Sequence, residues 1–180
     1  TNSTLSATLD TSSVTTLGAT AKLNSAALTL SGTGTLTVHD SATIAGSTIT
    51  IGEGASLSGA DSQIGGLTIT DSANNASVTV TALASDADLS GITVNGTNST
   101  LSATVTGNLT MNGSANLNGA AVAIADSFDL SLKDSELGTA TITDAGDNTA
   151  VTVTALASDA DLTGITVNGT NSTLSATVTG

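Results

Sequence analysis

Six aspartates recur at matching positions along the chain and are the residues best suited to binding a ligand. The tetrapeptide Ser-Asp-Ala-Asp occurs at 85–88 and again at 158–161. Carboxylates spaced closely in a turn are typical oxygen ligands of Ca²⁺. The candidate calcium ligands are Asp71, Asp86, Asp88, Asp144, Asp159 and Asp161.

The surrounding sequence favours solvated turns over a metal site at these aspartates. The glycine-rich nonapeptide of calcium-binding β-rolls is absent, and so is the EF-hand loop pattern. We therefore predict no cofactor and no metal, and keep calcium at the six aspartates as the open alternative.

The residue types needed for catalysis are scarce. The chain has no Arg, Tyr or Cys, and His39 is replaced by Asn112 at the matching position of the next repeat. Polysaccharide-cleaving enzymes with β-helical folds need paired carboxylates, or a base with a cationic stabiliser. Carboxylates that recur in each repeat suit a structural role instead. We predict that the protein is not an enzyme, and a carbohydrate-active β-helix is one alternative.

The net charge of −13 excludes two classes of partner. Nucleic-acid binding depends on Lys and Arg that neutralise phosphates, and anionic membranes attract the same basic residues. No apolar run is long enough to cross a bilayer. We therefore predict neither nucleic-acid binding nor membrane insertion in this segment.

The elements that carry these residues belong to a tandem repeat. Residues 67–107 align with 140–180 at an offset of 73, with 34 of 41 positions identical. The offset continues upstream, so the chain holds about two and a half copies of one unit. We treat 1–180 as a single continuous segment with a partial repeat at 1–33 and full repeats at 34–106 and 107–179.

Each repeat contains three copies of a shorter pattern, Leu/Ile-x-Gly-x-Thr-Ile/Val. It reads IAGSTI at 44–49, IGGLTI at 64–69 and LSGITV at 89–94. The glycines are 20, 25 or 28 residues apart, which suits one coil of a β-solenoid. Segments such as TITI at 48–51 alternate apolar and polar residues, as half-buried strands do. The predicted fold is an all-β, right-handed parallel β-solenoid of about seven coils, with 20–28 residues per coil and three coils per repeat.

Alignment of the coils on their glycines predicts two stacked columns of opposite character, as in-register stacking requires. The inward column comprises Ala21, Ile49, Ile69, Val94, Val122, Ile142 and Val167. The outward column comprises Thr20, Thr48, Thr68, Thr93, Ala121, Thr141 and Thr166. Paired Thr such as Thr48/Thr50 and Thr68/Thr70 could order water and bind ice, although Lys22 and Ala123 interrupt their columns.

The Thr-, Ser-, Gly- and Asn-rich strands with little Lys and no Cys resemble the β-strand-repeat regions of bacterial surface proteins. These families are the filamentous-haemagglutinin-like adhesins, autotransporter passenger domains and giant secreted adhesins. The resemblance covers the whole chain and rests on composition and on the pattern of short alternating strands. It implies an extracellular or cell-surface location and a structural role as stalk, fibre or adhesin body.

Three functions therefore follow as expectations. The first is a structural fibre or adhesin body, and the others are an amyloid-like biofilm filament of stacked short chains and an ice-binding solenoid. The expected partners are the chain itself, end to end or by continuation of the polypeptide, and surface glycans or other cells. Thr1 and Gly180 both fall within a coil, so we expect a longer array or an end-to-end filament.

Overall fold

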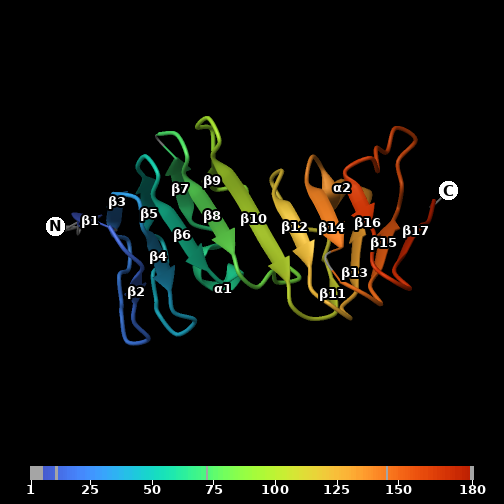
Figure 1. The fold of residues 1–180 in the computed structure, drawn as a ribbon, viewed down its shortest axis with the longest axis horizontal. Coiled ribbons are helices and arrows are strands. Elements are labelled where there is room, and N and C mark those ends of the chain that lie inside the picture. Colours follow the sequence, from blue (N-terminus) through green and yellow to red (C-terminus); the bar gives the residue numbers. More distant parts are fainter. Residues whose placement is uncertain (1–5, 11, 72, 145, 179–180) are drawn as a thin grey trace. The chain divides into compact units, whose positions relative to one another are not determined.

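The computed structural model describes residues 6–10, 12–71, 73–144 and 146–178 (Figure 1). The chain clusters into two compact units. Unit 1 comprises Thr1–Thr81 and Leu89–Leu101, and unit 2 comprises Ala82–Asp88 and Ser102–Gly180. Each is described by itself.

Unit 1 carries two parallel sheets, each built from one strand per coil (Figure 1). The first sheet contains β1 (Ser6–Asp10), β3 (Ala27–Ser31), β5 (Thr48–Ile51), β7 (Thr68–Asp71) and β9 (Ile92–Thr93). The second contains β2 (Thr15–Leu17), β4 (Thr35–Val38), β6 (Ser56–Gly59) and β8 (Ser77–Val80). The remaining side of the coils holds the bridge between Lys22 and Thr43 and the one-turn helix α1 (Asp61–Ile64).

Unit 2 repeats this arrangement. One sheet contains β10 (Thr100–Val105, of which unit 2 includes the part from Ser102), β12 (Ala121–Ile124), β14 (Thr141–Asp144) and β16 (Ile165–Val167). The other contains β11 (Leu109–Thr110), β13 (Leu130–Lys133), β15 (Ala150–Thr154) and β17 (Thr173–Ala176). The bridge between Asp88 and Asn116 and the one-turn helix α2 (Asp134–Leu137) complete the coils.

Consecutive strands in each sheet pair in parallel, which confirms the predicted all-β parallel solenoid. The chain forms about eight turns, against the seven expected. Paired residues within the ladders are 19 to 23 positions apart, as in Ala103↔Val122 and Ile69↔Ile92, whereas the residues of the isolated bridge Asp88↔Asn116 are 28 apart. Coil length therefore varies over about the same range as the spacing of the glycines.

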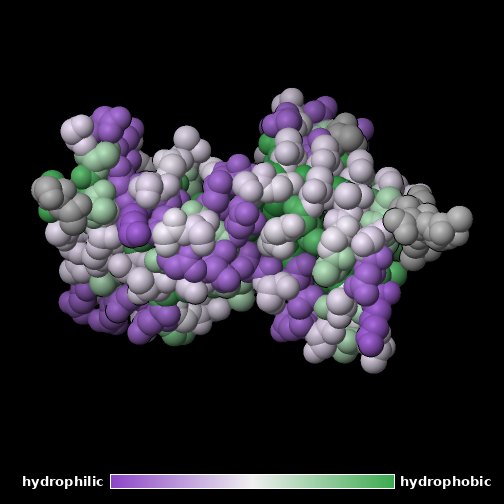
Figure 2. Space-filling model, turned by 180° about the vertical axis from the view of Figure 1, so that it is seen from behind, coloured by the Kyte–Doolittle hydropathy of each residue, from purple (hydrophilic) through white to green (hydrophobic). Residues whose placement is uncertain are grey.

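The core of each unit is a stack of aliphatic side chains. Along β5 the apolar residues Ile49 and Ile51 are buried, and Thr48 is exposed. Alternation of this kind sends successive side chains to opposite faces of a strand. The face drawn in Figure 2 is accordingly mostly pale to purple, as expected for a surface of Thr, Ser, Asn and Asp. Burial of many small aliphatic residues replaces the aromatic core that this sequence lacks.

The predicted inward column is correct at some coils and wrong at others. Ile49 pairs with Ile69, and Val122 pairs with Ile142, as expected. Ile69 pairs next with Ile92, however, so Val94 lies outside the column and is only half-buried. Val167 is displaced in the same way by Ile165. At the other end, Leu28 and not Ala21 pairs with Ile49.

The displacement of Val94 has a physical cause in the turn that precedes it. The Leu/Ile-x-Gly-x pattern forms a turn closed by a hydrogen bond between its first and fourth residues, in Ala120 N–H to Leu117 O and equally in Ile92 N–H to Leu89 O. Gly119 has a positive φ of 71° there, and two more residues follow before the column. Gly91 instead packs against the backbone of Leu67, where a Cβ would collide with Leu67 O. The pairing of β9 with β7 therefore begins at Ile92, the residue directly after Gly91.

A second set of turns forms a corner within each unit, and we call each set a corner column. One residue per coil adopts a left-handed conformation there: Gly54, Asn75 and Asn98 in unit 1, and Ser127, Asn148 and Asn171 in unit 2. Backbone bonds join successive members, as in Asn75 N–H to Thr97 O. The Asn98 side chain also donates to Asn75 Oδ1 at 3.3 Å, and Asn171 donates to Asn148 Oδ1 at 3.2 Å. Gly and Asn suit this corner because both tolerate positive φ.

Candidate functional site

The six candidate calcium ligands occupy two different environments. Asp86, Asp88, Asp159 and Asp161 are exposed, whereas Asp71 and Asp144 are buried. Asp161 accepts a hydrogen bond from Thr163 N–H at 2.9 Å, which lowers the pKa of its carboxyl. Within the described part of the chain, no three Asp, Glu or His side chains come together in a group able to hold a metal ion.

Asp71 joins two neighbouring coils of unit 1. Its Oδ1 accepts the N–H of Ala73 at 2.8 Å, two residues along the same turn. Its Oδ2 accepts the N–H of Gly96 at 2.9 Å, from the next coil. We call this arrangement the aspartate clasp. Gly96 is required there because a Cβ would collide with Ala73 O.

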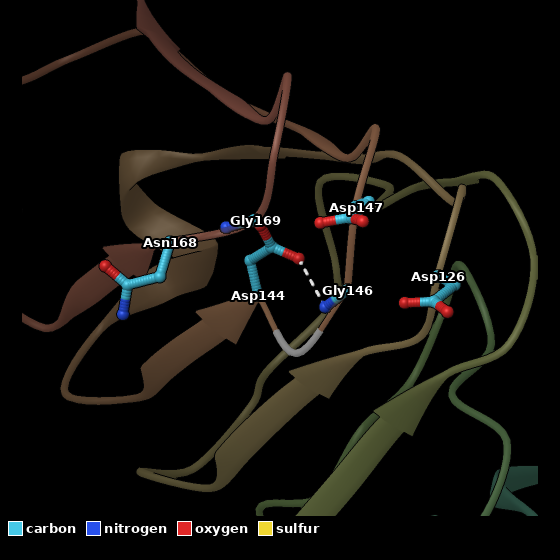
Figure 3. A pocket seen from close by; sticks show the side chains of 6 residues that line it. All are labelled: Asp126, Asp144, Gly146, Asp147, Asn168 and Gly169. Carbon is cyan, nitrogen blue, oxygen red and sulfur yellow. Dashed lines mark hydrogen bonds between the residues drawn. The ribbon is translucent and has the colours of Figure 1, made fainter.

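Asp144 forms the equivalent clasp in unit 2 (Figure 3). Its Oδ1 accepts the N–H of Gly146 at 2.9 Å, and its Oδ2 accepts the N–H of Gly169 at 3.1 Å. Ser172 supports the clasp, because its hydroxyl donates to Gly146 O at 3.2 Å and accepts Thr149 N–H at 3.1 Å. The same clasp therefore occurs once in each full repeat.

The electrostatics of the clasps favour ionised carboxylates. Burial raises the pKa of Asp71, but hydrogen bonds from Ala73 N–H, the Ser99 side chain and Gly96 N–H together outweigh it. The pKa of Asp144 is lowered in the same way against the effect of burial. Both values lie below the ordinary 3.8, because donors directed at a carboxylate stabilise its charged form. The negative charges are thus satisfied by backbone N–H groups within the protein.

A shallow hollow lies beside each clasp. The one beside Asp144 has a volume of about 310 Å³, and Asp126, Asp147 and Asn168 contribute to its lining (Figure 3). The one beside Asp71 measures about 210 Å³ and has Asn74 at the position of Asp147. The hollow in unit 2 therefore carries more negative charge, although both oxygens of Asp144 already accept N–H groups.

A continuous column of threonines covers the first sheet of unit 1. Register places Thr8 beside Thr29, Thr29 beside Thr50, Thr50 beside Thr70, and Thr70 beside Thr93. Thr50 is half-buried and the other four are exposed. We call these five residues the Thr column. The glycine alignment correctly placed Thr50 beside Thr70. It wrongly put Lys22 where the structure has Thr29, and it left Thr8 and Thr93 out of this column.

The Thr column has a partial neighbour on the same sheet. Ala27, Thr48 and Thr68 stack beside it, two positions earlier in each strand. Strand geometry sets about 4.8 Å between coils and about 6.6 Å between the two columns. The result is a regular array of hydroxyl and methyl groups without a charged side chain in either column.

His39 is exposed and has a local structural role. Its Nδ1 accepts the N–H of Ser41 at 3.1 Å. Asn112 has the same role at the matching position of the next repeat, where its Oδ1 accepts Ser114 N–H at 3.0 Å. Both side chains stabilise a turn, as short polar side chains commonly do.

Comparison with known proteins yields no match to a family model, to a curated protein or to a solved structure.

Within the described residues, neither one-turn helix nor any other helix has the length and apolarity that crossing a bilayer requires.

Proposed function

We propose that this chain is part of an extracellular structural protein, in which stacked coils form the stalk, fibre or body of an adhesin. The observation that carries the proposal is the coil-to-coil ladder within each unit, which is tied at the corners by the aspartate clasps. Each coil in such a stack depends on its neighbours, and repeats can be added without a new core. The resemblance to bacterial surface proteins supports the location.

The expected partners follow from this role. Further coils of the same kind extend the stack, either from the same polypeptide or from another copy, and surface glycans or other cells are the expected targets. Assembly of many short chains into an amyloid-like filament is the alternative way to the same length. Electrophoresis of the native material in strong denaturant separates the two, because only the filament dissociates into short chains.

Lengthening the chain tests the structural proposal. Appending further copies of residues 107–179 should extend the particle by about 14–15 Å per copy, because each of three coils rises about 4.8 Å. Small-angle X-ray scattering measures the maximum dimension. A dimension that does not grow linearly with copy number would contradict the proposal. Antibody labelling of intact source cells tests the location, since an internal protein is labelled only after permeabilisation.

Ice binding is a second candidate function, and the Thr column favours it. Five threonines in register present hydroxyl and methyl groups at a regular spacing of about 4.8 Å. Side chains held by a sheet lose little further freedom when they contact an ordered lattice. The flat array therefore offers a template that a flexible surface does not.

Substitutions in and outside the Thr column test ice binding. Purified protein should show thermal hysteresis, and Thr70→Lys should abolish it by raising a long charged side chain above the column. Thr143→Lys is the matched control, because Thr143 is exposed on the sheet of unit 2 beside Ala123, which interrupts the threonines there. Absence of hysteresis, or equal loss in both variants, would rule out the Thr column as an ice-binding surface.

A further inference from the structure

Four Asn-Gly pairs occur in this chain, and the structure places them in different chemical settings. They are Asn95-Gly96, Asn112-Gly113, Asn118-Gly119 and Asn168-Gly169. An Asn-Gly pair can cyclise, because the glycine nitrogen reaches the asparagine side-chain carbonyl without hindrance from a Cβ. The rate in a folded protein depends on how the two reacting groups are held.

At Asn112 the side-chain carbonyl is held and polarised. Its Oδ1 accepts the N–H of Ser114 at 3.0 Å and the hydroxyl of Ser114 at 2.7 Å. Two donors on one carbonyl oxygen stabilise the negative charge that develops there when a nucleophile attacks the carbon. The main chain of Asn112 is also fixed, because its N–H donates to Ser85 O at 2.7 Å and its C=O accepts Ala115 N–H at 3.0 Å.

The attacking nitrogen at this turn remains available. Asn112, Gly113 and Ser114 are exposed, and among the described residues no acceptor is hydrogen-bonded to Gly113 N–H. Lys133 Nζ lies close to Gly113, about 3.0 Å from where a Cβ would be. A positive charge beside the nitrogen favours the transient negative charge of the reaction.

At Asn95 and Asn168 the attacking nitrogen is engaged. Gly96 N–H donates to Asp71 Oδ2, and Gly169 N–H donates to Asp144 Oδ2, in the two aspartate clasps. Both glycines are only partly exposed and pack against the backbone of the neighbouring coil. Cyclisation there would break a charge-assisted hydrogen bond and move a coil.

We infer that Asn112 is a site of spontaneous covalent modification, at which the folded protein promotes conversion of asparagine to aspartate and isoaspartate. Gly113 N forms a bond to Asn112 Cγ while the Cγ–Nδ2 bond breaks, and ammonia leaves with the proton from Gly113 N. Water then adds to either carbonyl of the resulting succinimide and opens the ring. The product places a new carboxylate close to Lys133.

Mass spectrometry of the intact 180-residue chain tests this inference. The folded protein and the same chain in strong denaturant are incubated at mildly alkaline pH, and peptides are scored for exchange of the amide for a carboxyl group. In the folded chain Asn112 should react at least about tenfold faster than Asn95 and Asn168, since each of those must break a charge-assisted bond. In denaturant the three rates should converge.

Ser114→Ala is the decisive variant. Ser114 is exposed, so the variant should fold, and its reaction at Asn112 should slow by about threefold to tenfold, as expected for one hydrogen bond. Lys133→Gln should also slow it. Asn118 is the internal control, because its turn is closed by Ala120 N–H to Leu117 O and does not involve Ser114. Equal folded rates at Asn112 and Asn95, or an unchanged rate in Ser114→Ala, would overturn the inference.

Discussion

Replacing Ile69 with aspartate is expected to prevent cooperative folding of unit 1. Ile69 has 0% exposure and lies in register between Ile49 and Ile92, so the new carboxylate would be buried in an aliphatic stack. An unpaired charge in such a setting costs several kcal/mol. Domains of this size are stable by only about 5–15 kcal/mol, so the loss is a large part of the total.

Thr70→Asp is the matched control, because Thr70 is the next residue of the same strand and is exposed. Circular dichroism during chemical denaturation should show near-normal stability for Thr70→Asp and no cooperative transition, or a greatly weakened one, for Ile69→Asp. Val94→Asp should be intermediate, because Val94 is half-buried and outside the column. Similar stability of the Ile69 and Thr70 variants would contradict the assignment of inside and outside.

Loss of an aspartate clasp is expected to have the second largest effect. Asp144→Ala would leave the N–H groups of Gly146 and Gly169 without their acceptor, and Gly146 is buried. Hydrogen bonds to a charged group contribute roughly 1.5–3 kcal/mol each, so we expect a loss of about 3 kcal/mol or more. Asp144→Asn should also be destabilised, since an amide has only one acceptor oxygen and directs its NH₂ at one of the two donors.

The clasps also predict how stability depends on pH. The pKa of each clasp carboxyl is lowered in the folded state from the ordinary 3.8. Its contribution is therefore complete above about pH 4 and is lost as the pH falls through the folded value. The free energy of unfolding should decrease on acidification below about pH 4. In the Asp71→Asn/Asp144→Asn double variant this decrease over the same pH range should be smaller.

The exposed residue Asp86 provides the control for both experiments. Asp86→Asn should leave the free energy of unfolding within about 0.5 kcal/mol of the unmodified chain. An equal loss in the Asp86 and Asp144 variants, or a double variant with an unchanged pH dependence, would show that the clasps do not stabilise the coils.

Features set by neighbours in the chain could be predicted from the sequence. The alternation in TITI at 48–51 gave the correct inward residues of β5, and the Leu/Ile-x-Gly-x pattern marks real turns. Features that depend on contacts between coils could not be predicted from the sequence. Val94 and Ile92 are both apolar and lie two residues apart, so either keeps the alternation, and only the packing of Gly91 on Leu67 selects Ile92.

The role of the buried aspartates was hidden for the same reason. Asp71 and Gly96 are 25 residues apart, and nothing in the local sequence of either indicates that they meet. Grouping by composition joined Asp71 with the exposed Asp86 and Asp88 as candidate ligands. In the structure Asp71 instead links two neighbouring coils, and this role cannot be recognised from a single turn. The stacking of Thr50 on Thr70 was predicted, but the full Thr column was visible only once the register of β3 and β9 was known.

The corner columns bear on how a gene for such a protein can change in length. In three coils of each unit the chain passes its corner through one left-handed residue, and equivalent members recur in the two repeats, as Asn75 and Asn148 do. A duplication or deletion of 73 residues adds or removes one complete set of strands and turns, so each remaining side chain keeps its face. A shift of one residue within a strand would instead turn its aliphatic side chains to solvent. Unequal recombination between near-identical repeats could therefore produce alleles of different length that all fold.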